Sequence, residues 1–121
     1  MRYLCLVYFE PVTFEGMPAD EGRTLNRDSL AYDDELRASG HYIASNALQS
    51  VQSAVTVRVR NKRISTSDGP FAETKEHLGG FILIDAATLD EAVRIASGIP
   101  MAKYGSVEVR PIYDIPVEGP P

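Results

Sequence analysis

Residues 2–9, Arg-Tyr-Leu-Cys-Leu-Val-Tyr-Phe, decide the fold that we predict for this chain. Aromatic, β-branched and leucine side chains dominate this segment, which favours a β-strand. Alternate side chains of a strand point to opposite faces, and both sets are apolar here: Tyr3, Cys5, Val7 and Phe9 against Leu4, Leu6 and Tyr8. A strand with one face in water carries polar residues on that face. We therefore expect this strand to be covered on both faces.

A second strand of the same kind is predicted over residues 78–85, since Phe81–Ile84 is also apolar on both faces. Residues 10–18 indicate a loop, and a helix follows from about Pro18 to Ser39 with Leu25, Ser29, Tyr32 and Leu36 on one stripe. Gly40 is a typical helix stop, and residues 41–48 indicate a short strand.

Three further elements complete the chain. Val55, Val57 and Val59 alternate with polar residues, and the Asn61-Lys62 turn predicts an exposed hairpin over 54–60 and 63–67. Thr88 to Glu91 has the form of a capping box, so a helix should begin there, with Leu89, Ala92, Val93 and Ala96 facing the core, and end near Gly98. A last strand is predicted over 106–115.

The resulting order is that of an α+β, ferredoxin-like βαββαβ fold with an extra β-hairpin, in which two helices cover one face of an antiparallel sheet. The two doubly apolar strands then leave an apolar face uncovered. A second copy of the chain, packed sheet to sheet, would cover it and form a dimeric α/β barrel. The alternative cover is the hairpin folded under its own sheet.

Composition limits the function. The 121 residues allow one domain, which we place at 1–115 with a flexible tail at 116–121. The single cysteine fits a reducing cytoplasm, and no apolar run is long enough to span a membrane. With 17 acidic against 12 basic residues, nucleic-acid binding is disfavoured despite the basic hairpin. Two histidines and one cysteine in unrelated positions predict no metal site, and we expect no cofactor.

Residues 68–76, Asp-Gly-Pro-Phe-Ala-Glu-Thr-Lys-Glu, form the most distinctive segment, followed by Leu78-Gly-Gly-Phe81. The Asp68 side chain can close a turn, and Pro70 stiffens the corner. The charged residues that follow are either exposed ion pairs of little energetic weight or functional groups. Gly79-Gly80 indicates a bulge or a close backbone approach, or else makes room for a ligand.

This segment resembles the signature of the YCII-related proteins of the DGPF type, and the first strand, the Val-Arg hairpin and Val107–Pro111 extend the resemblance over nearly the whole chain. The resemblance implies a dimeric α/β barrel, in a superfamily that includes muconolactone isomerase-like enzymes, haem-handling monooxygenases and ligand domains of transcription factors. It also implies an association with extracytoplasmic-function sigma factors. His41 and His77 do not match the His–Asp pair of the enzyme-like relatives.

Two functional hypotheses follow. In the first, the chain is a homodimer that binds a small molecule and performs isomerase- or lyase-like proton transfer. Asp68, Glu73 and Lys75 would be its catalytic residues, with a carboxylate as general base and Lys75 holding an anionic group; the ligand contacts would be His41, Phe71, Glu76, His77 and Arg110. In the second, the chain is a non-catalytic accessory or sensor protein linked to a sigma factor, which docks through the hairpin or the 68–76 segment.

Overall fold

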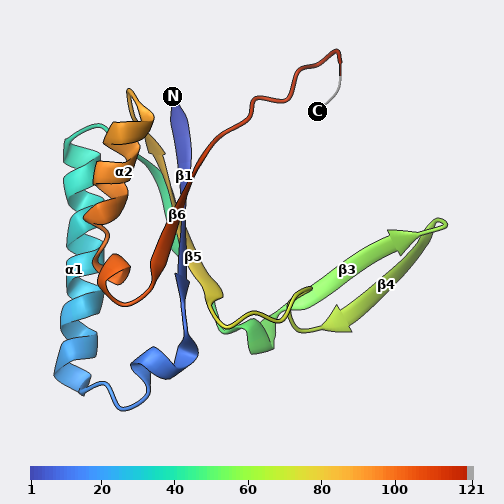
Figure 1. Ribbon diagram of the computed structural model, residues 1–121, viewed down its shortest axis with the longest axis horizontal. Helices are drawn as coiled ribbons and strands as arrows, with labels where there is room; N and C mark the ends of the chain where they lie inside the picture. Colours follow the sequence, from blue (N-terminus) through green and yellow to red (C-terminus); the bar gives the residue numbers. More distant parts are fainter. Residues whose placement is uncertain (120–121) are drawn as a thin grey trace.

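The computed structural model describes residues 1–119. Its strands are β1 (Arg2–Phe9), β2 (Tyr42–Ala47), β3 (Val55–Arg60), β4 (Arg63–Asp68), β5 (His77–Asp85) and β6 (Ser106–Pro111), and its α-helices are α1 (Ala19–Ala38) and α2 (Leu89–Ser97). The main sheet is antiparallel in the order β2-β5-β1-β6, while β3 and β4 pair only with each other. Both α-helices lie on one face of the main sheet (Figure 1). The predicted α+β, ferredoxin-like arrangement is confirmed.

Helix α1 begins and ends where the sequence predicts. Pro18 precedes its first turn, and Gly40 adopts a φ of +81° just after its last. The amide of His41 donates to the Leu36 carbonyl at 2.9 Å, and that of Gly40 donates to the Arg37 carbonyl at 3.2 Å. These bonds form a Schellman motif, which satisfies the free carbonyls of the helix end.

The capping box of α2 is present in a modified form. The Glu91 amide donates to the Thr88 hydroxyl at 3.1 Å, but the Glu91 carboxylate accepts from the Ala87 amide, at 3.0 Å. The predicted inward stripe was partly wrong. Leu89 and Val93 are exposed, and the buried side chains are those of Ala92, Ile95 and Ala96. They are spaced i, i+3 and i+4, so the core-facing stripe is rotated by one position.

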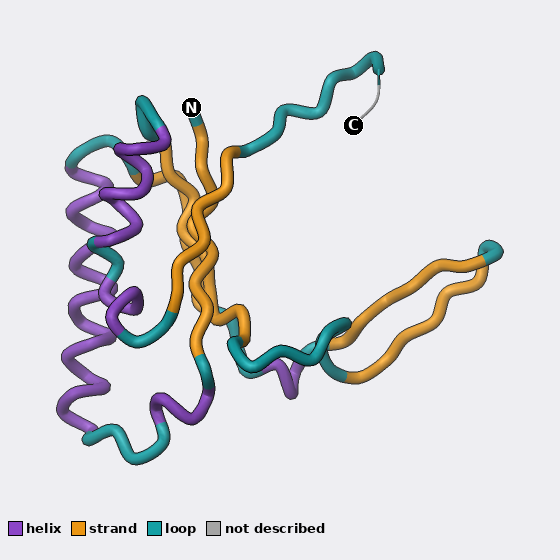
Figure 2. Tube along the Cα trace, viewed as in Figure 1, coloured by secondary structure: helices purple, strands orange, loops and turns teal. Residues whose placement is uncertain are grey.

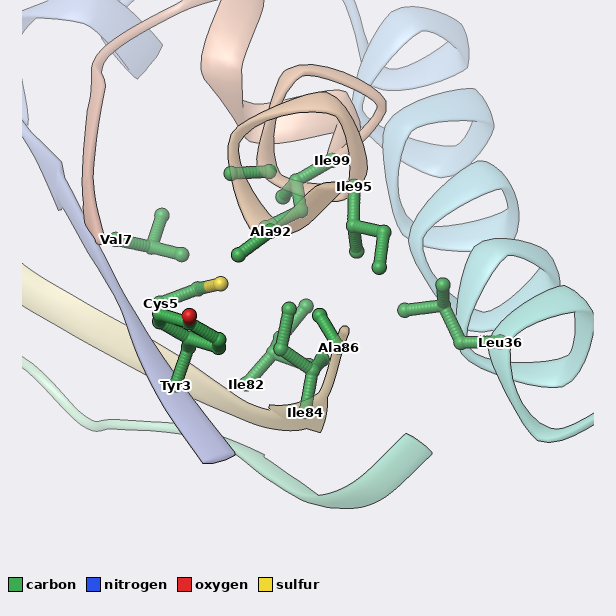
Figure 3. Packing of buried hydrophobic residues seen from close by; sticks show 11 residues of the cluster. Tyr3, Cys5, Val7, Leu36, Ile82, Ile84, Ala86, Ala92, Ile95 and Ile99 are labelled. Carbon is green, nitrogen blue, oxygen red and sulfur yellow. The ribbon is translucent and has the colours of Figure 1, made fainter. Parts of the chain in front are cut away.

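The core lies between the helices and the sheet (Figure 3). It joins one face of β1 and β5 to the inner sides of both helices. Its members, 9% exposed or less, are Tyr3, Cys5, Val7, Leu36, Ile82, Ile84, Ala86, Ala92, Ile95, Ala96 and Ile99. No polar side chain is buried among the described residues. This face of the sheet is closed by the chain's own helices.

The other face of the sheet is open. Leu4 lies opposite Leu83, and Leu6 lies opposite Phe81, so these four apolar side chains share that face and are half-buried. On the outer strand β6, Glu108 lies beside Leu6, and Arg110 lies beside Leu4. The hairpin does not fold under this face, because β3 and β4 project away from the sheet as a separate arm (Figure 1).

The predicted bulge at Gly79 is present, and the last strand is shorter than predicted. Gly79 is the extra residue of a bulge, since Val7 pairs with Gly80 and Tyr8 with Leu78. A Cβ at Gly79 would overlap the ring of Phe9, so the predicted bulge and close approach both occur. Strand β6 ends at Pro111 rather than at residue 115, because its partner β1 begins at Arg2, whose carbonyl accepts from the Ile112 amide at 2.9 Å. The predicted flexible tail, 116–121, extends beyond the described residues.

Candidate functional site

Two hollows bring polar side chains together, one on each face of the sheet. The first is an open recess of about 560 Å³ on the open face, where the end of β1 meets the start of β6. It is lined by Tyr8, Glu10, Thr74, Lys75, Glu76, Ser106, Val107 and Glu108. Three carboxylates and one ammonium group make the recess acidic.

The recess contains two of the predicted site residues. The Lys75 Nζ lies 3.5 Å from a Glu10 carboxylate oxygen, and the Ser106 hydroxyl donates to Glu76 at 3.1 Å. The Thr74 hydroxyl donates to the Glu76 carbonyl at 2.6 Å, which shapes the chain locally. Residues 69–76 form no strand, so the alternation of side chains expected for an extended segment does not apply to Glu73, Lys75 and Glu76.

Other residues predicted for the site lie elsewhere. Asp68 is the last residue of the arm, and its corner is held by backbone: the Gly69 amide donates to the Ala54 carbonyl at 2.7 Å, with Gly69 at a φ of +92°. Glu73 and Phe71 are exposed. His77 begins β5 opposite Phe9.

Neither Arg110 nor His41 lines the recess: Arg110 contacts one of its lining residues, and His41 lies at the far end of β5. The Arg110 Nε donates to Glu108 at 2.6 Å, so the two side chains pair within β6 on the open face. His41 is near the Asp85 end of β5, whereas the 68–76 segment leads to its His77 end, roughly 26 Å away along the strand. There the His41 Nδ1 lies 2.8 Å from the Asp85 carbonyl and 3.7 Å from the Glu91 carboxylate.

The second hollow is a groove of about 940 Å³ between α1 and the sheet. Its walls are mainly apolar. They come from α1, β2, the parts of β1 and β5 beside the Gly79 bulge, and the segment around Pro100. Among its lining residues are Phe9, Phe14, Met17, Leu25, Leu30, Leu48, Ile99 and Met101. The T-shaped contact of Phe9 with Phe14, with ring centroids 5.0 Å apart, stiffens one wall.

Polar side chains from α1 and β2 meet in this groove. The Ser45 hydroxyl donates to the Asp33 carboxylate at 3.0 Å, and the Tyr42 hydroxyl lies 2.9 Å from the Ser45 oxygen. Asp33 and Ser45 both line the groove, as does Ser29. Sequence reasoning missed this set, although a serine on the apolar stripe of α1 was a signal that the stripe faces something other than core.

Tyr32 of α1 links this helix to α2 beside the groove. Its hydroxyl donates to the Ile95 carbonyl at 2.7 Å. Burial, followed by the nearby carboxylate of Glu35, raises the pKa of Tyr32. A Cβ at Gly98 would overlap the Tyr32 ring, so the glycine permits this approach of α1 to α2. Tyr32 therefore acts as a neutral hydrogen-bond donor that holds one wall in place.

Within residues 1–119, neither hollow holds a reactive thiol or a cluster of side chains that could bind a metal ion. Burial raises the pKa of the Cys5 thiol to about 11, which leaves it protonated and inert at neutral pH. Within residues 1–119, no three histidine, cysteine or acidic side chains lie close enough together to hold a metal ion. The chemistry available is that of carboxylates, hydroxyls and one lysine.

Comparison with known proteins identifies the family. The model of the YCII-related domain matches residues 1–116. The chain belongs to the YCII-related family. A relative in Rhizobium meliloti (strain 1021), named "Uncharacterized protein R00369", is 36% identical over 114 residues, which are 93% of this chain and 92% of the relative. No helix within residues 1–119 of this YCII-related chain is long and apolar enough to cross a membrane.

A solved structure shares the fold. It is the 5-chloro-2-hydroxyhydroquinone dehydrochlorinase TftG from Burkholderia phenoliruptrix AC1100, in complex with 2,5-dihydroxybenzoquinone. The superposition has a TM-score of 0.54 and covers 93% of this chain and 94% of that one, at 16% sequence identity. At this identity the likeness establishes a common fold.

Proposed function

We propose that this YCII-related chain is a homodimer that binds a small, mainly apolar molecule in the groove between α1 and the sheet, and that it performs lyase- or isomerase-like proton transfer there. The groove itself carries the proposal. Its volume of about 940 Å³ suits a small ligand, and its apolar walls converge on a few polar groups, the usual composition of a binding site.

Asp33 is the residue best placed to act as general base. Its carboxylate lines the groove and accepts a hydrogen bond from Ser45, which orients it. The carboxylate would take a proton from a ligand carbon, and the freed C–H electron pair would form a double bond. In a lyase the leaving group on the next carbon departs with its own electron pair; in an isomerase the proton returns to another carbon. The dehydrochlorinase activity of TftG, a structural neighbour, supports this reaction class.

The open face of the sheet supports the homodimer. Leu4, Leu6, Phe81 and Leu83 form an apolar surface that a second copy of the chain would cover. Packing of the second copy on this face would enclose a chamber that includes the acidic recess. Lys75 and Glu76 lie in that recess, with Asp68 and Glu73 further along the same segment. This chamber is therefore the alternative ligand site, in which the predicted catalytic residues Asp68, Glu73 and Lys75 would act.

A metabolite thermal-shift screen, with 2,5-dihydroxybenzoquinone in the panel, tests the groove directly. A ligand at 100 times its Kd should stabilise the chain by about 2.7 kcal/mol. Gly22→Leu should abolish that shift without harming the fold. Gly22 lines the groove, a Cβ there meets nothing within 4 Å, and leucine favours a helix more than glycine does. Thr24→Leu, on the exposed side of α1, is the matched control and should keep the shift.

The same screen separates the two sites and the two functions. Asp33→Asn should leave binding measurable and abolish turnover of the ligand found. Lys75→Met should change neither ligand binding nor turnover. If Lys75→Met removes the thermal shift while Gly22→Leu does not, the ligand binds in the open-face chamber instead. A panel that yields no ligand, together with capture of a purified sigma factor, would favour the accessory function.

A further inference from the structure

The arm formed by β3 and β4 forms no sheet with the other strands of residues 1–119. Its two strands pair only with each other around the Asn61-Lys62 turn, where both residues have positive φ. Figure 2 shows the pair projecting far from the main sheet on its open side. An isolated two-stranded hairpin is marginally stable in water. An arm of this kind is expected to gain its stability from something that it contacts.

One face of the arm is apolar. Val57 is 60% exposed, Val59 is 56% exposed, and Ile64, which pairs with Val59, is 75% exposed. Val55 lies on the same face and is equally exposed. Thr66 and Asp68 also lie on this face, opposite Val57 and Val55. The other face is polar and carries Thr56, Arg58, Arg60, Arg63, Ser65 and Ser67. Such alternation is typical of a hairpin with one face covered and one in water, yet nothing in the described chain covers the valine face.

Charge points to the body of a second copy as the cover. Residues 54–68 contain four cations, Arg58, Arg60, Lys62 and Arg63, against one carboxylate, a net charge of +3. Since the whole chain carries −5, the other 106 residues carry −8. Two arms would therefore repel each other, whereas an arm and a body attract.

The open face of the sheet offers both features that the arm requires. Its centre is apolar, and its edge is the recess bordered by the carboxylates of Glu10, Glu76 and Glu108. We propose that the arm of each copy packs its valine face on the open sheet face of the other copy, so that Lys62 in its turn enters the partner's acidic recess. The recess is then completed by the second copy, and Lys62 becomes its additional anion-binding group for an acidic ligand.

This inference rests on the proposed homodimer but is tested separately from it. Sedimentation of the full chain should give a dimer at micromolar concentration. Val57→Asp should raise the dimer Kd by about a hundredfold or more, because it places a carboxylate on the covered face. Ser65→Asp adds the same charge on the opposite face and should change the Kd less than about fivefold. Circular dichroism should show that both variants keep the fold.

A zero-length carbodiimide cross-link locates the arm tip. In a mixture of isotope-labelled and unlabelled copies, Lys62 should link to Glu10, Glu76 or Glu108 of the other copy. A wild-type dimer that Val57→Asp leaves intact would overturn the arm inference and leave the homodimer standing. A wild-type monomer would overturn both, while ligand binding in the groove is still judged by its own assay. Links between copies that join Lys62 only to other carboxylates would overturn the placement in the recess.

Discussion

The two faces of the main sheet are formed by the same four strands but differ in what covers them. On the helix face, Cys5 and Ile84 are 0% exposed and α1 and α2 complete the packing. On the open face, Leu4 and Leu83 occupy neighbouring positions of the same strands and remain half-exposed. Equally apolar strand faces therefore do not have equal roles. One is part of the core of the chain, and the other is left uncovered within the described residues.

The largest expected effect comes from truncating one side chain on each face. Ile84→Ala should lower the free energy of unfolding by about 3–4 kcal/mol, since it leaves a cavity in a closed core. Leu83→Ala removes similar atoms from a half-exposed position and should cost about 1 kcal/mol. Urea denaturation at a concentration where the chain is monomeric measures both. Equal losses would mean that the two faces do not differ as described.

Alkaline pH probes the closed face at Cys5. Its pKa is about 11 in the folded chain against 9.0 for a free thiol, so the folded state resists losing the proton. The stability is fully present below pH 9 and is lost as the pH rises towards 11, by about 2 kcal/mol at pH 10.5. Denaturation of the wild type and of Cys5→Ala at pH 8 and 10.5 isolates this part. A pH dependence identical in the two proteins would contradict it.

The comparison of faces also explains what the sequence could predict. Strand alternation and helix caps are local, so the element order, the α1 stripe, the Gly40 stop and the Gly79 bulge could each be predicted from a short segment of the sequence. The uncovered apolar face followed from counting helices against strands. These predictions depend on periodicity and turn chemistry within single segments.

The candidate site was less accessible because it is assembled from distant segments. The groove needs Asp33 of α1 beside Ser45 of β2, a contact that depends on how the helix crosses the sheet. The recess needs Lys75 beside Glu10, across the end of β1. Local patterns do not fix the path of residues 69–76 for the same reason, since these residues form no strand and connect the arm to β5.

A hydrogen bond on the closed face should have a moderate effect. Tyr32→Phe removes the donor to the Ile95 carbonyl and should cost about 1 kcal/mol, the usual net value for a bond of this kind. Tyr104→Phe is a suitable control, because its hydroxyl donates to Glu21 at the surface. Thermal unfolding should show a clear loss for the first variant and a smaller one for the second. A larger loss for Tyr104→Phe would contradict the assignment of Tyr32 as the link between the helices.

The smallest expected effect is on the open face, at the pair formed by Glu108 and Arg110. These side chains are 43% and 70% exposed, and an exposed ion pair contributes about 0–0.5 kcal/mol to unfolding. Glu108→Gln should therefore leave the unfolding of the monomer unchanged, as should Asp34→Asn in the exposed pair with Arg37 on α1. The two variants should differ in assembly, because only Glu108 borders the recess. A selective rise in the dimer Kd for Glu108→Gln, strongest at low salt, would show that this charge serves the interface rather than the fold.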